Sequence, residues 1–139
     1  MLIIRRSTQK DAPAILDVLT ATDLLYPNYK RDSFWTAERD DKIVGVVRVE
    51  EHADFALIES LGVLPQYQKQ GIASQLLKES TNAMAKDLYL YTLIPEYFTN
   101  LGFQPIDPPA FIPSRNRYDC KGCRPEQCVC MVRKTKHAA

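Results

Sequence analysis

Four cysteines near the C-terminus have a spacing that can bind a metal. Cys120, Cys123, Cys128 and Cys130 lie in the stretch CKGCRPEQCVC, with the pattern C-x2-C-x4-C-x-C. Four thiolates within tetrahedral reach can bind zinc, and iron–sulfur ligation is chemically open to them as well. The same cysteines can instead be free thiols, with Cys128 and Cys130 packed on one face of a final strand, or can form a redox pair. The sequence therefore leaves a zinc site as one of several open interpretations.

A second candidate site lies where a strand leads into a helix, in the stretch ESLGVLPQYQKQGIASQLL of residues 59–77. Gly71 opens the helix, where unpaired backbone N–H groups and the helix dipole favour an anion such as phosphate. Gly71 also lets the backbone approach a ligand closely, and Ala73 keeps a following position small. The stretch lacks both G-K-[ST] and G-x-G-x-x-G, so neither a Walker-type loop nor a dinucleotide fold is indicated. A plain strand–turn–helix connection would have the same pattern, so the phosphate site is a hypothesis.

The apolar pattern predicts the elements that position these residues. Alternating and β-branched runs predict strands, and an apolar period near that of a helix predicts helices. The predicted strands are residues 2–6, 34–40, 42–51, 55–65, 87–93, 103–106 and 128–134, and the predicted helices are residues 7–21, 66–86 and 95–103. The order is therefore β-α-β-β-β-α-β-α-β, with one more short strand at the C-terminal end.

Two motifs within this order resemble those of a known family. Residues 68–73 fit the pattern [Q/R]-x-x-G-x-[G/A], and YFTNLGF follows at residues 97–103. With the strand and proline before the loop, these motifs resemble the GNAT superfamily of acyl-CoA N-acyltransferases over residues 2–106. The resemblance implies a single α/β (α+β) domain over residues 1–139, with a central mixed, mostly antiparallel sheet of six or seven strands flanked by helices. Residues 107–139 would be a Pro/Cys-rich extension that ends in a short strand.

The resemblance also implies acetyl-CoA as the cosubstrate and assigns residues to it. In this family the strand before the loop binds the pantetheine arm through its backbone, which here would be Leu61 and Val63. The N–H groups of the loop hold the pyrophosphate. The residues around it would be Gln68, Lys69, Gly71, Ala73 and Ser74. A splay between the strand of residues 55–65 and the strand DLYLYTL would admit the thioester.

Glu59 is the candidate general base that would take a proton from an ammonium nucleophile. It lies in an otherwise apolar strand, on the same face as Leu57, Leu61 and Val63 if the side chains alternate. An ion pair with Arg48, or simple edge exposure, is the alternative. Arg48 is a lone cation in the strand VGVVRVE and is the candidate for binding a substrate carboxylate with two hydrogen bonds. A solvent-facing strand residue would give the same pattern.

The sequence departs from the family at the position of a general acid. Many members have a tyrosine in the motif FYxxLGF that protonates the departing CoA thiolate. Phe98 occupies that position here, and Tyr97 comes one residue early, where its hydroxyl is expected to point toward water. A thiol with a free pKa of about 8.5 leaves as the thiolate without strong acid help, so acetyl transfer is still expected.

The C-terminal part resembles short bacterial amino-acid N-acetyltransferases related to N-acetylglutamate synthase. The likeness lies in YFTNLGF, the proline-containing loop, the C-x2-C segment and a final strand with a methionine, while the spacing after Cys123 departs from that group. It implies an amino-acid acceptor such as glutamate or glutamine. Residues 115–136 contain seven lysines and arginines against two acidic residues, which would suit an acidic acceptor. Acetyltransferases linked to arsenic resistance share these features, so the substrate stays open.

Bulk properties limit the remaining alternatives. A chain of 139 residues, 45% hydrophobic and 25% charged, is typical of one globular domain. A net charge of +1 does not indicate a nucleic-acid binder, and no apolar run reaches the length of a membrane span. The clustered cysteines and the lack of a signal-peptide core predict the cytoplasm, where thiols stay reduced. An exposed edge strand at the C-terminus would permit a homodimer.

These observations support one leading hypothesis. It is an acetyl-CoA-dependent N-acetyltransferase that acts on a small-molecule amine by direct transfer. The alternative is a non-catalytic CoA-binding or partner-binding module with a cysteine-rich, zinc-binding tail. A nucleic-acid-binding zinc module is the third interpretation, and the near-neutral net charge disfavours it.

Overall fold

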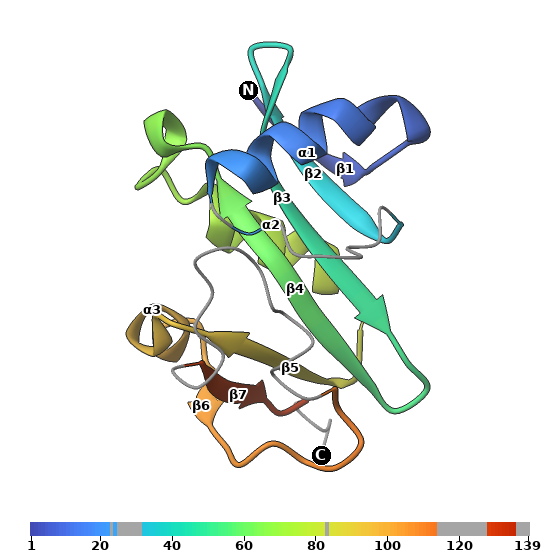
Figure 1. The fold of residues 1–139 in the computed structure, drawn as a ribbon, viewed down its shortest axis with the longest axis vertical. Coiled ribbons are helices and arrows are strands. Elements are labelled where there is room, and N and C mark those ends of the chain that lie inside the picture. Colours follow the sequence, from blue (N-terminus) through green and yellow to red (C-terminus); the bar gives the residue numbers. More distant parts are fainter. Residues whose placement is uncertain (23, 25–31, 83, 114–127, 136–139) are drawn as a thin grey trace.

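One seven-stranded sheet organises the chain (Figure 1). The computed structural model describes residues 1–22, 24, 32–82, 84–113 and 128–135. The strands are β1 (Leu2–Arg6), β2 (Phe34–Arg39), β3 (Lys42–Glu51), β4 (Phe55–Val63), β5 (Asp87–Thr92), β6 (Gln104–Pro105) and β7 (Val129–Arg133). Their order is β1-β2-β3-β4-β5-β7-β6, with β4 and β5 parallel and the other neighbours antiparallel. The predicted mixed, mostly antiparallel α/β fold is confirmed.

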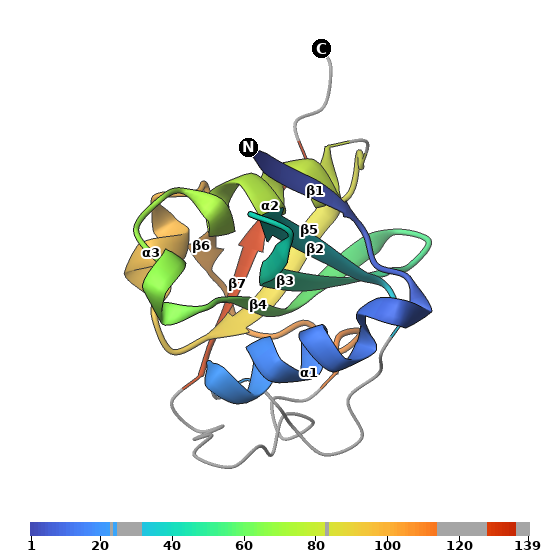
Figure 2. The same cartoon turned by 90° about the horizontal axis from the view of Figure 1, so that it is seen from above.

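The two longer helices cover opposite faces of this sheet (Figure 2). The helices are α1 (Ala12–Ala21), α2 (Ile72–Thr81) and α3 (Pro95–Thr99), with short 3-10 turns η1 (Gln9–Asp11) and η2 (Pro65–Tyr67). Ile15, Val18 and Leu19 of α1 and Leu76 and Leu77 of α2 are buried against the strands. None of the helices formed by the described residues has the length and apolar character needed to cross a lipid bilayer.

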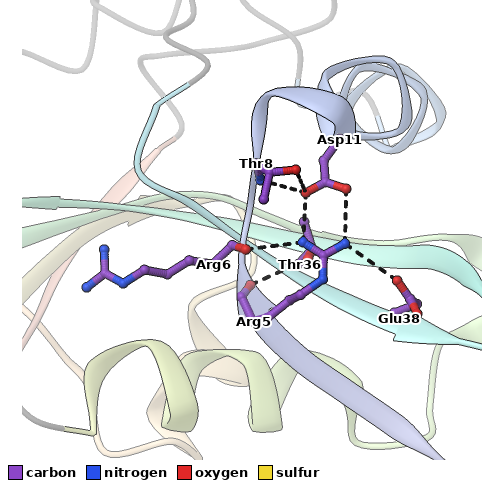
Figure 3. Close-up of polar contacts among 6 residues, drawn as sticks. All are labelled: Arg5, Arg6, Thr8, Asp11, Thr36 and Glu38. Atoms are coloured by element: carbon purple, nitrogen blue, oxygen red, sulfur yellow. Dashed lines mark hydrogen bonds and ion pairs between the residues drawn. The ribbon is translucent and has the colours of Figure 1, made fainter.

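A charged cluster fixes the start of α1 on the sheet (Figure 3). The Arg5 guanidinium in β1 donates two hydrogen bonds to the Asp11 carboxylate, at 2.8 and 3.0 Å, and also lies 3.5 Å from Glu38 in β2. The Thr8 N–H donates to the same carboxylate at 2.7 Å. The hydrogen bonds from Arg5, as the largest cause, lower the pKa of the Asp11 carboxyl to about 2. Two strands and the beginning of α1 are therefore joined at one buried carboxylate.

The C-terminal strand lies inside the sheet. β7 pairs with β5 on one side and with β6 on the other, so the sequence-based expectation of an exposed C-terminal edge strand is wrong. Cys130, Met131 and Val132 are accordingly buried. Insertion between two strands buries both faces and both edges of a short apolar segment, which is why a stretch far along the chain contributes to the core.

Candidate functional site

An irregularity in β4 decides which residues of the candidate site share a face. Arg48 of β3 pairs with Glu59, but Val46, two residues away, pairs with Gly62. β4 therefore contains one extra residue, and Ser60 takes a left-handed backbone with φ of 56°. This β-bulge reverses the alternation of side chains beyond Glu59.

The consequence for the predicted site is a correction. A Cβ on Gly62 would lie 2.9 Å from the Thr22 hydroxyl oxygen just after α1, so Gly62 faces the α1 side of the sheet. A Cβ on Gly45 would lie 3.3 Å from the Val63 side chain and 3.0 Å from Leu76 of α2. Glu59 thus shares the α1 face with Leu57, as expected, but Leu61 and Val63 lie on the α2 face. The predicted common face of Glu59, Leu61 and Val63 is wrong because uniform alternation does not hold across a bulge.

β4 and β5 are paired over only part of their length. The ladder between them consists of Phe55 with Asp87, Ala56 with Leu88 and Leu57 with Tyr89. β4 then continues to Val63 and β5 to Thr92, and the two strands diverge in Figure 1. This is the splay that the family resemblance implied.

The divergence leaves backbone groups of β4 available to a ligand. The Leu64 N–H donates to the Val44 carbonyl of β3 at 2.8 Å. In an extended chain the N–H groups of neighbouring residues point to opposite sides, so that of Val63 is directed toward the β5 side, as is that of Leu61. Backbone hydrogen bonding from these two residues was the role predicted for them.

The loop after β4 has the conformation expected of an anion site. Lys69 and Gly71 have left-handed φ angles of 64° and 80°, and Gly71 is the N-cap of α2. The first bond of the helix runs from the Gln75 N–H to the Gly71 carbonyl, at 3.1 Å. By helix geometry the N–H groups of residues 72–74, which include Ala73 and Ser74, lack intrahelical acceptors. A Cβ on Gly71 would meet no atom within 4 Å, so the space in front of this turn is open.

Gln68 has a different place from its loop neighbours. Its side-chain amide donates to the Val63 carbonyl at 2.9 Å, which ties the start of the loop back to the end of β4. The side chain therefore shapes the loop from within. A nearby hollow of about 530 Å³ lies on the α1 side of η2 and is lined by Ala14, Asp17, Val18, Ala21, Lys42, Ile43, Leu64, Pro65 and Gln66. This lining contains none of the predicted site residues, so the hollow is distinct from the site at the loop and the splay.

Arg48 and Glu59 form a buried ion pair. Their exposed fractions are 2% and 4%, and the Arg48 Nη1 contacts Glu59 Oε1. The same guanidinium donates to the Asp32 carbonyl at 3.0 Å and lies 3.3 Å from the Asp32 carboxylate and 3.9 Å from that of Glu50. Of the alternatives that the sequence left open, the ion pair is the one the structure contains, and a solvent-facing Arg48 is excluded by its burial. The guanidinium is already occupied by protein oxygens.

The tyrosine position of the family motif is part of the core. Phe98 in α3 is 8% exposed and packs edge-on against Phe103, with ring centres 5.8 Å apart. Tyr97 is 37% exposed, and its partial burial raises the pKa of its phenol. Leu93 and Ile94, between β5 and α3, are more than half exposed. Sequence reasoning missed this apolar surface at the end of β5, because an apolar pair after a strand normally indicates core.

The described cysteines differ in burial. Cys130 is 2% exposed and packs in an apolar cluster with Leu57, Tyr89, Ile112 and Val132, while Cys128 is half-buried and both are free thiols. Within the described ranges no three His, Cys, Asp or Glu side chains gather as metal ligands. Cys120 and Cys123 lie outside the described residues, so the predicted four-cysteine set stays a prediction.

Comparisons with known proteins agree with this geometry. A family model described as an acetyltransferase (GNAT) domain matches residues 30–105. The fold is similar to N-acetylglutamate synthase from Neisseria gonorrhoeae complexed with coenzyme A and L-arginine, with a TM-score of 0.78 and 21% identity over 98% of this chain and 34% of that one. The chain therefore spans about a third of that synthase.

Two further solved structures are similar over nearly their whole length. The PaiA N-acetyltransferase from Thermoplasma acidophilum, in complex with coenzyme A, has a TM-score of 0.73 and 16% identity over 96% of this chain and 99% of that one. The ribosomal-protein-S18-alanine N-acetyltransferase from Escherichia coli has a TM-score of 0.71 and 16% identity over 100% of this chain and 97% of that one. No curated protein sequence matches the chain. Identities this low establish a common fold.

Proposed function

The chain belongs to the GNAT acetyltransferase family, and we propose that it transfers an acetyl group from acetyl-CoA directly to the amine of a small molecule. The observation that carries this proposal is the pairing of β4 with β5, which ends at Leu57 and Tyr89, just before the open left-handed turn at Gly71. A thioester arm between the strands and phosphates at the turn would each meet unpaired backbone N–H groups.

Binding of the cosubstrate is assigned to backbone more than to side chains. The N–H groups of Leu61 and Val63 would receive the pantetheine arm, and those around Gly71, Ala73 and Ser74 would receive the pyrophosphate. Lys69 is exposed and adds positive charge beside the phosphates. Gln68 would act indirectly, by tying the loop to the Val63 carbonyl.

Glu59 is the proposed general base, directly or through a water that it orients. The neutral amine would attack the thioester carbonyl carbon, forming a C–N bond as the C–S bond breaks and the sulfur leaves with its electron pair. Backbone N–H groups near residues 61–63 would stabilise the oxyanion. Because Phe98 offers no hydroxyl, the thiolate would take its proton from solvent.

We further propose an amino-acid acceptor such as glutamate or glutamine. Support comes from the fold shared with the Neisseria gonorrhoeae synthase, which was also solved in complex with N-acetyl-glutamate, and from the basic C-terminal stretch. Arg48 enters this proposal in a changed form. Since Glu59 and Asp32 occupy its guanidinium, its part in acceptor binding is to hold these two residues in place.

The setting of the reaction is also proposed. Residues 1–139 would act as one catalytic domain, because β7 near the C-terminal end lies within the sheet that carries the site. A cytoplasmic location is favoured by the clustered cysteines, since thiols stay reduced there. Zinc binding by the four cysteines stays open as part of the C-terminal extension.

The decisive experiment is acetyl transfer from acetyl-CoA to a panel of the twenty amino acids and simple polyamines. Products are detected by mass spectrometry, so that the thiols of the protein do not confuse the readout. An acetylated glutamate or glutamine is the expected product. CoA binding with no product on any acceptor would instead favour the non-catalytic CoA-binding alternative, and absence of both binding and transfer would contradict the proposal.

A further inference from the structure

The last residue of β2 contacts the loop that precedes α2. The Arg39 Nη1 donates a hydrogen bond to the Gln70 side-chain carbonyl oxygen. Gln70 lies between Lys69 and Gly71, the two residues with left-handed φ angles. A side chain from a different strand thus holds the middle of the turn whose N–H groups face open space.

This contact is the second of two anchors on the loop. The first is the hydrogen bond from the Gln68 amide to the Val63 carbonyl, at 2.9 Å. Lys69 lies between the two anchored glutamines and has a left-handed conformation that residues with a side chain seldom adopt. A strained residue of this kind persists when its surroundings determine it. Anchors on both sides of Lys69 provide that determination.

The charge of Arg39 is also available to a ligand. Among the ion pairs formed by the described residues, none includes Arg39. Its neighbours across the sheet are Leu2 and Lys42, neither of which is acidic. The neutral Gln70 amide therefore positions the guanidinium without cancelling its charge, next to a turn that suits an anion.

From these contacts we propose that Arg39 is a positioning residue for the phosphates of the cosubstrate. It acts through Gln70 to hold the Lys69–Gly71 turn in its phosphate-binding conformation. This inference rests on the proposed acetyl-CoA site. It predicts that Arg39 matters only for donors that carry the pyrophosphate.

The test compares two acetyl donors on the full chain. Acetyl-CoA carries the phosphates, whereas S-acetylpantetheine has the same thioester arm without them. Arg39→Met should raise the KM for acetyl-CoA about three- to tenfold, the range for loss of one charge-assisted hydrogen bond, with kcat unchanged. The KM for S-acetylpantetheine should not change. Equal shifts for both donors, or no shift for acetyl-CoA, would overturn the proposal.

A double-mutant cycle tests whether the two side chains act together. Gln70→Met should reproduce the effect of Arg39→Met, and the double variant should show no further loss. Additive effects would overturn the coupling. Arg39→Lys keeps the charge but loses the planar fork and should remain impaired, so full recovery by lysine would refute positioning through Gln70.

Two controls separate other causes. Lys78 is exposed on α2 beyond its first turn, and Lys78→Met removes the same charge without touching the loop. It should leave the KM for acetyl-CoA within about twofold, because solvent screens exposed charges at that separation. If the wild type neither binds CoA nor transfers acetyl, the proposed function fails. If the wild type is active and the Arg39 variants match it, only the present inference fails.

Discussion

Arg48 and Glu59 face each other across β3 and β4 and form an ion pair in which both side chains are more than nine-tenths buried. The pair lies immediately before the bulge at Ser60, on the α1 face of the strand that carries the proposed pantetheine site. Two roles converge on Glu59 as a result. It compensates a buried cation, and it is the proposed base.

The two roles of Glu59 can be separated by comparing activity with stability. Glu59→Gln keeps the shape and a hydrogen-bond acceptor, so the domain should stay folded while kcat falls about 100-fold or more if the carboxylate accepts the proton. The affinity for CoA, measured by calorimetry, should not change. Wild-type kcat and an unchanged pH profile in the glutamine variant would remove Glu59 from the mechanism and leave the structural role.

Loss of the compensating charge should be costly. Glu59→Leu leaves the Arg48 guanidinium buried beside Asp32 and Glu50 alone, so the free energy of unfolding should fall by about 3 kcal/mol. The double variant Arg48→Met with Glu59→Leu should recover most of that loss, because an apolar pair needs no compensation. Urea titration followed by circular dichroism measures both, and a double variant as unstable as the single one would contradict this account.

Gly71 should be required for cosubstrate binding. Gly71→Glu places a carboxylate where phosphate oxygens are proposed to bind, and CoA binding should be abolished. Gly71→Gln is the matched control, since it has the same size and the same backbone strain at a φ of 80° but no charge. The glutamine variant should retain measurable affinity. Wild-type affinity in the glutamate variant would place the phosphates elsewhere.

Gly62 should be intolerant of any side chain. A Cβ there would lie 2.7 Å from the Leu24 Cδ1 and 2.9 Å from the Thr22 Oγ1, so the end of α1 would have to move off β4. Gly62→Ala is expected to reduce the free energy of unfolding by about 1–3 kcal/mol, as overpacking does. Gly45→Ala is the comparison, because its nearest atom is the end of the flexible Leu76 side chain at 3.0 Å. A larger loss in the Gly45 variant would contradict the predicted order.

The Arg5–Asp11 pair should make stability depend on acid pH. The pKa of Asp11 is about 2 in the folded protein against an ordinary 3.8, so its contribution is complete above pH 3.8 and is lost as the pH falls through 2. Asp11→Asn should therefore cost about 1–2 kcal/mol at pH 7, a value reduced for the partly exposed Arg5. Urea unfolding at several pH values should show wild type and variant converging near pH 2, and a constant difference would exclude this titration.

Local features of the sequence were enough to locate much of the site. The glycine at position 71 indicated a helix start because only a turn with left-handed backbone needs it there, and the structure has that conformation. Phe98 in the tyrosine position likewise followed from the motif alone. Turn chemistry and apolar periodicity depend on neighbouring residues, so they can be predicted without knowing what lies across the sheet.

Other features depended on pairing between distant segments. The bulge at Ser60 arises from the register of β4 against β3, and it moved Leu61 and Val63 to the opposite face from Glu59. The place of β7 between β5 and β6 and the contact of Arg39 with Gln70 join residues far apart in the chain. The sequence by itself determined the elements and the helix-opening turn. Only the tertiary structure decided which side chains meet, because that choice depends on the summed free energy of non-local contacts rather than on local conformational preference.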